Sequence, residues 1–227
     1  PNLVVRGNSL VMEEAVLPDG TTTDIRVPLT DEGMMLINWP HKSYEDSFTH
    51  VSFYQIWAHD DLLDRLVFNL RAREDWGYPN LPDLIRLYED SEQARLAGLD
   101  DPTEANVANY VDSREFFLEQ VGAYLDSGVD ERLSGQVDSL LNSGQLSDAQ
   151  VQDYQRIRDD IPEFYANTRD IYTRLTEIRA DLRSKLEGAF TIIGHSATGT
   201  TDIGVNPFEE RYMNVGTHAA VANTILQ

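Results

Sequence analysis

The sequence predicts an α/β protein in which the two ends of the chain form a sheet core and the residues between them form a large helical-bundle insertion. Two short apolar runs predict the core, at residues 34–39 and at residues 189–193, and the second is rich in β-branched residues, as buried strands are. Between these runs, apolar residues recur at three- and four-residue intervals, which predicts the helical insertion. We therefore expect a core of residues 1–58 and 186–227, interrupted by an acidic helical insertion of residues 59–185.

Short strands are predicted at the first end of the chain. Residues 3–6 and 9–12 are apolar runs separated by residues 7–8, Gly-Asn, which are typical of a hairpin loop. Residues 23–29 alternate polar and apolar side chains, as a half-buried strand does. Pro28 favours a place for this strand at a sheet edge or for itself at a strand end. We expect a hairpin followed by a third strand.

Helices are predicted throughout the middle of the chain. Ser52 has the side chain of an N-cap and opens the first of them. Ser147 and Gln150 form a capping-box pattern that starts the longest helix. Pro162 is expected to kink that helix or divide it in two. Beyond the opening at Ser52, the predicted helices cover residues 60–73, 84–97, 103–125, 130–141 and 147–185.

The last part of the chain is predicted to contain a strand, a loop and a helix. Gly188 ends the long helix as a C-cap would, and the run at 189–193 follows it. Residues 194–202 are mostly small or hydroxyl-bearing, and open α/β sheets place functional loops directly after such strands. Residues 216–227 carry apolar side chains close to helical spacing. We therefore expect this loop to contain the functional residues.

The charge of the chain excludes two classes of partner. The sequence has 39 acidic and 18 basic residues, giving a formal net charge of -21, and 41% of its residues are hydrophobic. Such a balance is globular, but it is far too acidic for binding nucleic acid or an anionic lipid surface. Residues 59–160 alone hold 23 acidic and 9 basic residues, so the acidity lies in the insertion.

Several other kinds of site are not predicted. The chain has no cysteine, so neither a disulfide nor a thiolate site is expected. No stretch approaches the ~20 apolar residues of a membrane-spanning helix. Adjacent acids such as Asp60-Asp61 point to different sides of a helix, and residues 126–138 lack the calcium-loop pattern, so no metal or other cofactor is predicted. Because the chain starts at Pro1 without a Met, we expect a fragment of a longer protein.

Two blocks far apart in the sequence match one family pattern. The first block contains residues 27–29, 33, 35–39 and 48–56. The second block contains residues 186–194, 197, 202, 207 and 215–226. Together they resemble the second type of CHASE domain, an extracytoplasmic sensor found in front of membrane-bound nucleotide cyclases, histidine kinases and some serine/threonine kinases. The chain departs from the family pattern at residues 213–217.

The resemblance implies the carboxyl half of a sensor core that carries a long insertion. It implies a location on the periplasmic or extracellular face of a bacterial inner membrane, with membrane helices and a cyclase or kinase domain outside this fragment. The chain itself is then not an enzyme. Its expected partner is a small-molecule or protein signal rather than nucleic acid, and a second copy in a homodimer is a further candidate.

A ligand site is predicted in the loop and at the first block. Hydroxyls and free backbone N–H groups near glycine suit a phosphate, a carboxylate or a small polar ligand. Alternatively, the hydroxyls cap the loop's own backbone, and Asn38 likewise either caps a turn or faces a ligand. The candidate ligand residues are Asn38, Gly194, Ser196, Thr198, Gly199, Thr200 and Asp202.

Ser196 also suggests a hydrolase. Residues 194–198 come within one residue of the nucleophile elbow of α/β-hydrolases, but Thr198 stands where the last glycine should be. Asp202 and His218 are the only Asp and His that follow, with no room for an intervening strand. This reading is less favoured than a tight structural loop, and no catalytic residue is predicted.

Two function classes are therefore carried forward. A small-molecule sensor should show a closed pocket near Asn38 and the loop at 196–202. A free-standing interaction module of the cell envelope should instead show an exposed apolar or aromatic patch on the insertion. In a sensor, the signal acts through different affinities for two conformations.

Overall fold

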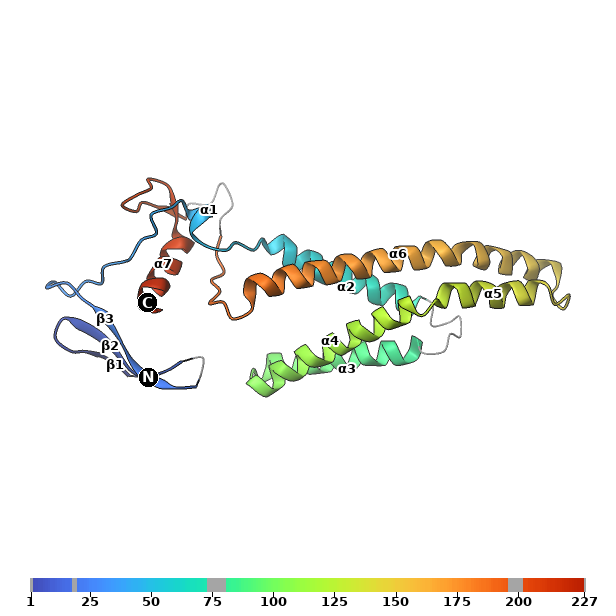
Figure 1. Ribbon diagram of the computed structural model, residues 1–227, viewed down its shortest axis with the longest axis horizontal. Helices are drawn as coiled ribbons and strands as arrows, with labels where there is room; N and C mark the ends of the chain where they lie inside the picture. Colours follow the sequence, from blue (N-terminus) through green and yellow to red (C-terminus); the bar gives the residue numbers. More distant parts are fainter. Residues whose placement is uncertain (1, 18–19, 73–80, 196–201, 227) are drawn as a thin grey trace. The chain divides into compact units, whose positions relative to one another are not determined.

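The computed structural model describes residues 2–17, 20–72, 81–195 and 202–226 (Figure 1). The chain divides into two compact units. The first, called the end unit, comprises Pro1–Val51 and Lys185–Gln227; the second, called the helical unit, comprises Ser52–Ser184. The end unit contains small antiparallel sheets and the helical unit contains long helices, so the fold is mixed α/β.

The helical unit begins earlier than the predicted insertion at residue 59. Ser52 caps α2 (Phe53–Arg71), its hydroxyl accepting a hydrogen bond of 3.2 Å from the backbone N–H of Tyr54. Gln55, in the first turn of α2, donates a hydrogen bond of 3.1 Å to Asp181 of α6 (Asp148–Leu186). The first turns of α2 therefore belong to the helical unit.

The first sheet of the end unit has three antiparallel strands. β1 (Asn2–Val5) pairs with β2 (Ser9–Val16), and β2 pairs with β3 (Thr22–Pro28). Reciprocal backbone hydrogen bonds of 2.9 and 3.2 Å between Arg6 and Ser9 close the β1–β2 loop. The predicted hairpin and third strand are confirmed, with Pro28 at the end of β3.

The predicted sheet core built from both ends of the chain is wrong. Residues 34–39 contribute only an isolated bridge between Leu29 and Met35, and residues 189–195 form no strand. The side chain of Phe190 is 71% exposed and that of Ile193 is 93% exposed, because no neighbouring strand covers them. Both sheets among the described residues are antiparallel, and each comes from one end alone.

The second sheet leads into the closing helix. β4 (Ile203–Gly204) pairs with β5 (Tyr212–Met213), and α7 (Asn214–Leu226) follows at once. The side-chain oxygen of Asn206 accepts backbone hydrogen bonds of 2.8 and 2.7 Å that hold the turn between these strands. α7 packs against β3, so it joins the two ends of the chain, and the predicted closing helix is confirmed.

Five helices of the helical unit are described. They are α2, α3 (Leu81–Asp100), α4 (Glu104–Asp126), α5 (Val129–Leu141) and α6. Each one contains or overlaps a predicted helix. The capping box is confirmed, because the backbone N–H of Ser147 donates to the side chain of Gln150 at 3.0 Å and the Gln150 N–H points back at the Ser147 hydroxyl at 3.5 Å.

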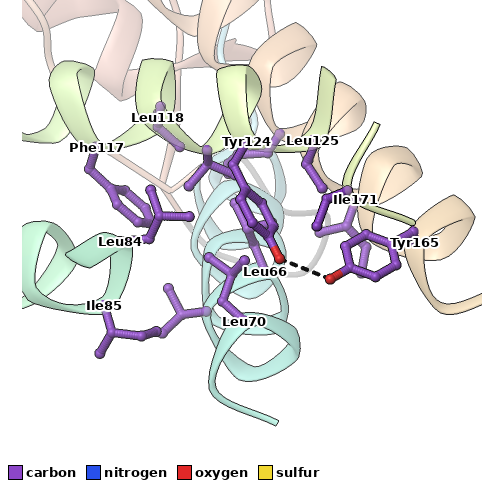
Figure 2. Packing of buried hydrophobic residues seen from close by; sticks show 14 of the residues in the cluster. Leu66, Leu70, Leu84, Ile85, Phe117, Leu118, Tyr124, Leu125, Tyr165 and Ile171 are labelled. Atoms are coloured by element: carbon purple, nitrogen blue, oxygen red, sulfur yellow. Dashed lines mark hydrogen bonds between the residues drawn. The ribbon is translucent and has the colours of Figure 1, made fainter. Parts of the chain in front are cut away.

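The core of the helical unit draws on all five helices (Figure 2). Leu66 and Leu70 of α2 pack near Leu84 of α3 and Phe117 of α4. Inside this apolar cluster, the hydroxyls of Tyr124 on α4 and Tyr165 on α6 lie 2.8 Å apart and share a hydrogen bond. Pairing each buried hydroxyl in this way removes the cost of desolvating it.

Pro162 does not divide the long helix. α6 is continuous from Asp148 to Leu186, and Figure 1 draws it as one unbroken helix. Proline removes one backbone N–H and crowds the preceding turn. Ile161 and Tyr165 beside it are almost completely buried in the core, and this packing holds the helix together across the interruption.

Ion pairs fix α6 against its neighbours. Arg158 pairs with Asp138 of α5 at 2.5 Å. The guanidinium of Arg169 pairs with both carboxylate oxygens of Asp130 at 2.7 and 2.9 Å, and Arg183 pairs with Glu115 of α4. In all three pairs the arginine is on α6 and the acid is on α4 or α5.

Candidate functional site

The structure describes three of the seven predicted ligand residues, which are Asn38, Gly194 and Asp202. The other four lie outside the described residues; they are Ser196, Thr198, Gly199 and Thr200. The nucleophile elbow predicted around Ser196 lies largely outside them as well.

Asn38 and Asp202 both contact the closing helix. The backbone N–H of Asn38 donates a hydrogen bond of 2.9 Å to the hydroxyl of Thr224. The carboxylate of Asp202 accepts a hydrogen bond of 3.0 Å from the side-chain amide of Asn214, whose backbone N–H also donates to the Asp202 carbonyl at 3.2 Å. These contacts hold α7 in place, so both residues have a structural task in the end unit.

Gly194 is explained by close packing. A Cβ atom at this position would lie 2.3 Å from Cγ2 of Val215 in the first turn of α7, a distance that no side chain tolerates. Gly204 meets the same helix in the same way, since its Cβ would lie 2.3 Å from the side-chain oxygen of Asn214. The glycines therefore allow the chain to approach the start of α7, and this close approach is a structural reason for glycine at both positions.

Sequence analysis missed the aromatic cluster beside these residues. Tyr212 packs edge-on against Trp39, with ring centroids 5.5 Å apart, and against Tyr44 of α1 (Tyr44–Ser47), at 5.8 Å. The ring of His50 contacts Tyr44 at 4.6 Å. These four residues, called the Tyr212 cluster, join the segment after β3 to the start of α7.

Two polar atoms at this cluster are buried and have no hydrogen-bond partner among the described residues. They are the hydroxyl of Tyr212 and one carboxylate oxygen of Glu209. Burial raises the pKa of Tyr212, and the negative charge of Glu209 raises it further. The hydroxyl therefore stays protonated at neutral pH. The hydroxyl is thus a free donor, and the Glu209 oxygen is a free acceptor.

Gly216 makes room for this hydroxyl. A Cβ on Gly216 would lie 2.8 Å from the Tyr212 hydroxyl and 2.7 Å from the ring of Tyr44. Unpaired buried polar atoms are rare in native structures and often mark a site for a polar molecule. Among the described residues, the Tyr212 cluster with Glu209 is therefore the better candidate site in the end unit.

The less favoured hydrolase reading gains no support from Asp202, the acid that could serve it. Asp202 is bonded to Asn214 instead of a histidine, and His218 is exposed on α7. Within the described ranges, no group of three or more His, Asp and Glu side chains is arranged to hold a metal ion. Of the helices described, none is both long and apolar enough to cross a membrane.

A buried arginine in the helical unit was also missed. Arg114 of α4 is almost completely buried, pairs with Glu92 of α3, and lies over the rings of Tyr88 and Tyr110, 5.0 and 5.6 Å from their centroids. Cation–π stacking and one ion pair hold this charge between α3 and α4. Its spacing in the sequence resembles that of ordinary surface arginines, so periodicity gave no signal for it.

Comparison with protein-family models, curated proteins and solved structures finds no match to this chain. The functional conclusion therefore depends on the two sequence blocks and on the geometry of the end unit.

Proposed function

We propose that the chain is part of an extracytoplasmic sensory domain of a membrane-bound signalling protein, with a nucleotide cyclase or a histidine or serine/threonine kinase as its output. One observation carries the proposal: the two sequence blocks, apart from residues 52–56, belong to one compact unit, where Asn38 bonds to Thr224 and Trp39 packs against Tyr212. The strands expected at 34–39 and 189–193 are absent from the described sheets, so the proposal rests on this meeting of the blocks and not on a matching sheet.

The proposed mechanism runs through α7. A signal that carries a hydrogen-bond acceptor and a donor would pair with the Tyr212 hydroxyl and with one carboxylate oxygen of Glu209. These two oxygen atoms are buried and lack partners among the described residues. Such pairing favours the conformation that presents both atoms, and a signal changes the output only by this difference in affinity. Since the strand that contains Tyr212 leads directly into α7, the bias passes to the helix that the resemblance places before the membrane.

The expected location of the domain outside the cytoplasm can be tested with reporter fusions. Alkaline phosphatase is active only outside the cytoplasm, and β-galactosidase only inside it. In the full-length protein, a phosphatase fused after residue 227 should be active, and a β-galactosidase fused at the same point should be inactive. The reverse pattern would place the domain in the cytoplasm and refute the proposal.

A further inference from the structure

An aromatic face on α2 is exposed in the helical unit. The side chains of Phe53, Tyr54, Trp57 and Phe68 are 76%, 68%, 53% and 72% exposed. The opposite face of the same helix carries the buried leucines and valine of the core. Large aromatic residues clustered on one exposed helix face mark an interaction surface, whereas single exposed apolar residues need no explanation.

The spacing of these residues places them along one side of α2, in a stripe that has no Phe, Tyr or Trp between Trp57 and Phe68. Phe53, Trp57 and Phe68 lie at positions i, i+4 and i+15, which fall on the same side of a helix with 3.6 residues per turn. The stripe is roughly 22 Å long at a rise of 1.5 Å per residue. A partner helix of about four turns would cover it.

Carboxylates lie within the stripe. Asp60 and Asp64 are exposed, and Asp61 is half-buried between them. Arg65 lies 3.7 Å from Asp61, and His59 contacts Asp60, while Asp64 forms no ion pair within the described part of the chain. The helical unit as a whole has 27 acidic residues against 13 arginines and no lysine.

This combination selects the chemistry of the occupant. A second copy of the chain would bring one row of carboxylates against another, which charge repulsion disfavours. Lysine or arginine side chains would meet both the carboxylates and the faces of the aromatic rings, and cation–π contacts add to the ion pairs. We propose that this stripe, called the α2 face, binds a cationic amphipathic helix of another protein. An exposed aromatic patch is also what the alternative function, a free-standing interaction module, is expected to show, so the inference does not depend on the sensory role proposed above.

The probe is a peptide of about 16 residues, the length of the stripe, with leucine on one helical face and lysine on the other. A peptide with glutamate in place of lysine is its counterpart. Calorimetric titration of the 227-residue chain should show binding of the lysine peptide only. Trp57→Ser should weaken this binding by at least about tenfold, as loss of a large aromatic anchor does.

Matched controls separate the α2 face from general attraction to an acidic protein. Phe116→Ser removes another half-exposed aromatic side chain, on α4, and should change the affinity by less than about twofold. A charge variant carries Asp60→Asn, Asp61→Asn and Asp64→Asn and should also weaken binding about tenfold. Its control carries the same charge change at exposed positions of α6: Asp153→Asn, Asp160→Asn and Glu163→Gln.

Three results would overturn the proposal. In the first, the α6 control weakens binding as much as the α2 charge variant, which would mean non-specific charge attraction. In the second, the lysine peptide fails to bind, or the glutamate peptide binds equally well. In the third, sedimentation shows that the chain dimerises and that Trp57→Ser abolishes the dimer, so that a second copy is the occupant. Unchanged helical circular dichroism of each variant confirms that these exposed substitutions leave the fold intact.

Discussion

The helical unit and the end unit differ most in how they bury side chains. Among the described residues, the main buried cluster contains 19 hydrophobic residues, all of them in the helical unit. The buried hydrophobic residues described in the end unit are Val11, Ala15, Val27, Tyr212 and Ala220. A helix satisfies its own backbone, so its apolar stripe needs only another stripe to pack against. A strand is buried only where the rest of the chain supplies a neighbour.

The largest expected effect tests the core of the helical unit. Phe117 is fully buried, so Phe117→Ala should lower the free energy of unfolding by about 3–5 kcal/mol through lost contacts and the cavity left behind. Urea titration followed by helical circular dichroism measures this change. Its neighbour Phe116 is half-exposed, and Phe116→Ala should change the free energy by no more than about 0.5 kcal/mol. Equal effects at the two positions would contradict the described packing.

An ion pair gives the next effect, which depends on pH. Hydrogen bonding from Arg169 lowers the pKa of Asp130 in the folded chain. The pair therefore stabilises the fold above the unfolded pKa of about 4 and loses this effect as pH falls through the lower folded value. Asp130→Asn should cost about 1–3 kcal/mol at pH 7 and less below about pH 4, as urea titration at several pH values measures.

Asp170 provides the control for this prediction. It lies on α6, 3.6 Å from Arg174, and both side chains are largely exposed. Asp170→Asn should change the free energy of unfolding by less than about 1 kcal/mol at any pH. A loss at Asp130 that is independent of pH would show that its charge is not what stabilises the fold.

The smallest effect compares one buried hydroxyl from each unit. Tyr124 is paired with Tyr165, so Tyr124→Phe should destabilise α4 by about 0.5–1.5 kcal/mol. The hydroxyl of Tyr212 has no partner among the described residues, so Tyr212→Phe should leave α7 as stable or make it slightly more stable. Amide hydrogen exchange of the two helices measures both changes. Equal losses would show that the Tyr212 hydroxyl is paired in the folded chain.

The helices could be predicted because their signals are local. Ser52 and Ser147 both cap helices as predicted, and the apolar residues spaced along one side of α2 are buried, whereas Phe116 of α4, which has the same kind of spacing, is half-exposed. The absence of strands at 34–39 and 189–193 could not be predicted from such local signals. A β-branched apolar run indicates what a buried strand looks like, but it carries no information on whether a partner strand lies beside it.

The candidate site was predicted only in part. Asn38 and Asp202 were singled out for their polar side chains, and the structure uses both to hold α7. Tyr212 was missed because it lies in a two-residue strand whose sequence has no periodicity to read. The one local signal was Gly216 in the first turn of an apolar helix, where close approach of another group is the usual reason for glycine.

Ion pairs that join α6 to α4 and α5 restrict how this helix can move. Arg158, Arg169 and Arg183 meet acids whose order along the chain is reversed, at separations of roughly 16 and 21 Å along the helix axis. Sliding α6 lengthwise by one turn, about 5.4 Å, would break the pairs of Arg158 and Arg169 together, whereas Glu115 has a second partner one turn away in Arg179, at 3.7 Å. We therefore expect α6 either to keep one position along its axis or to move to another in a single step, without a stable intermediate position.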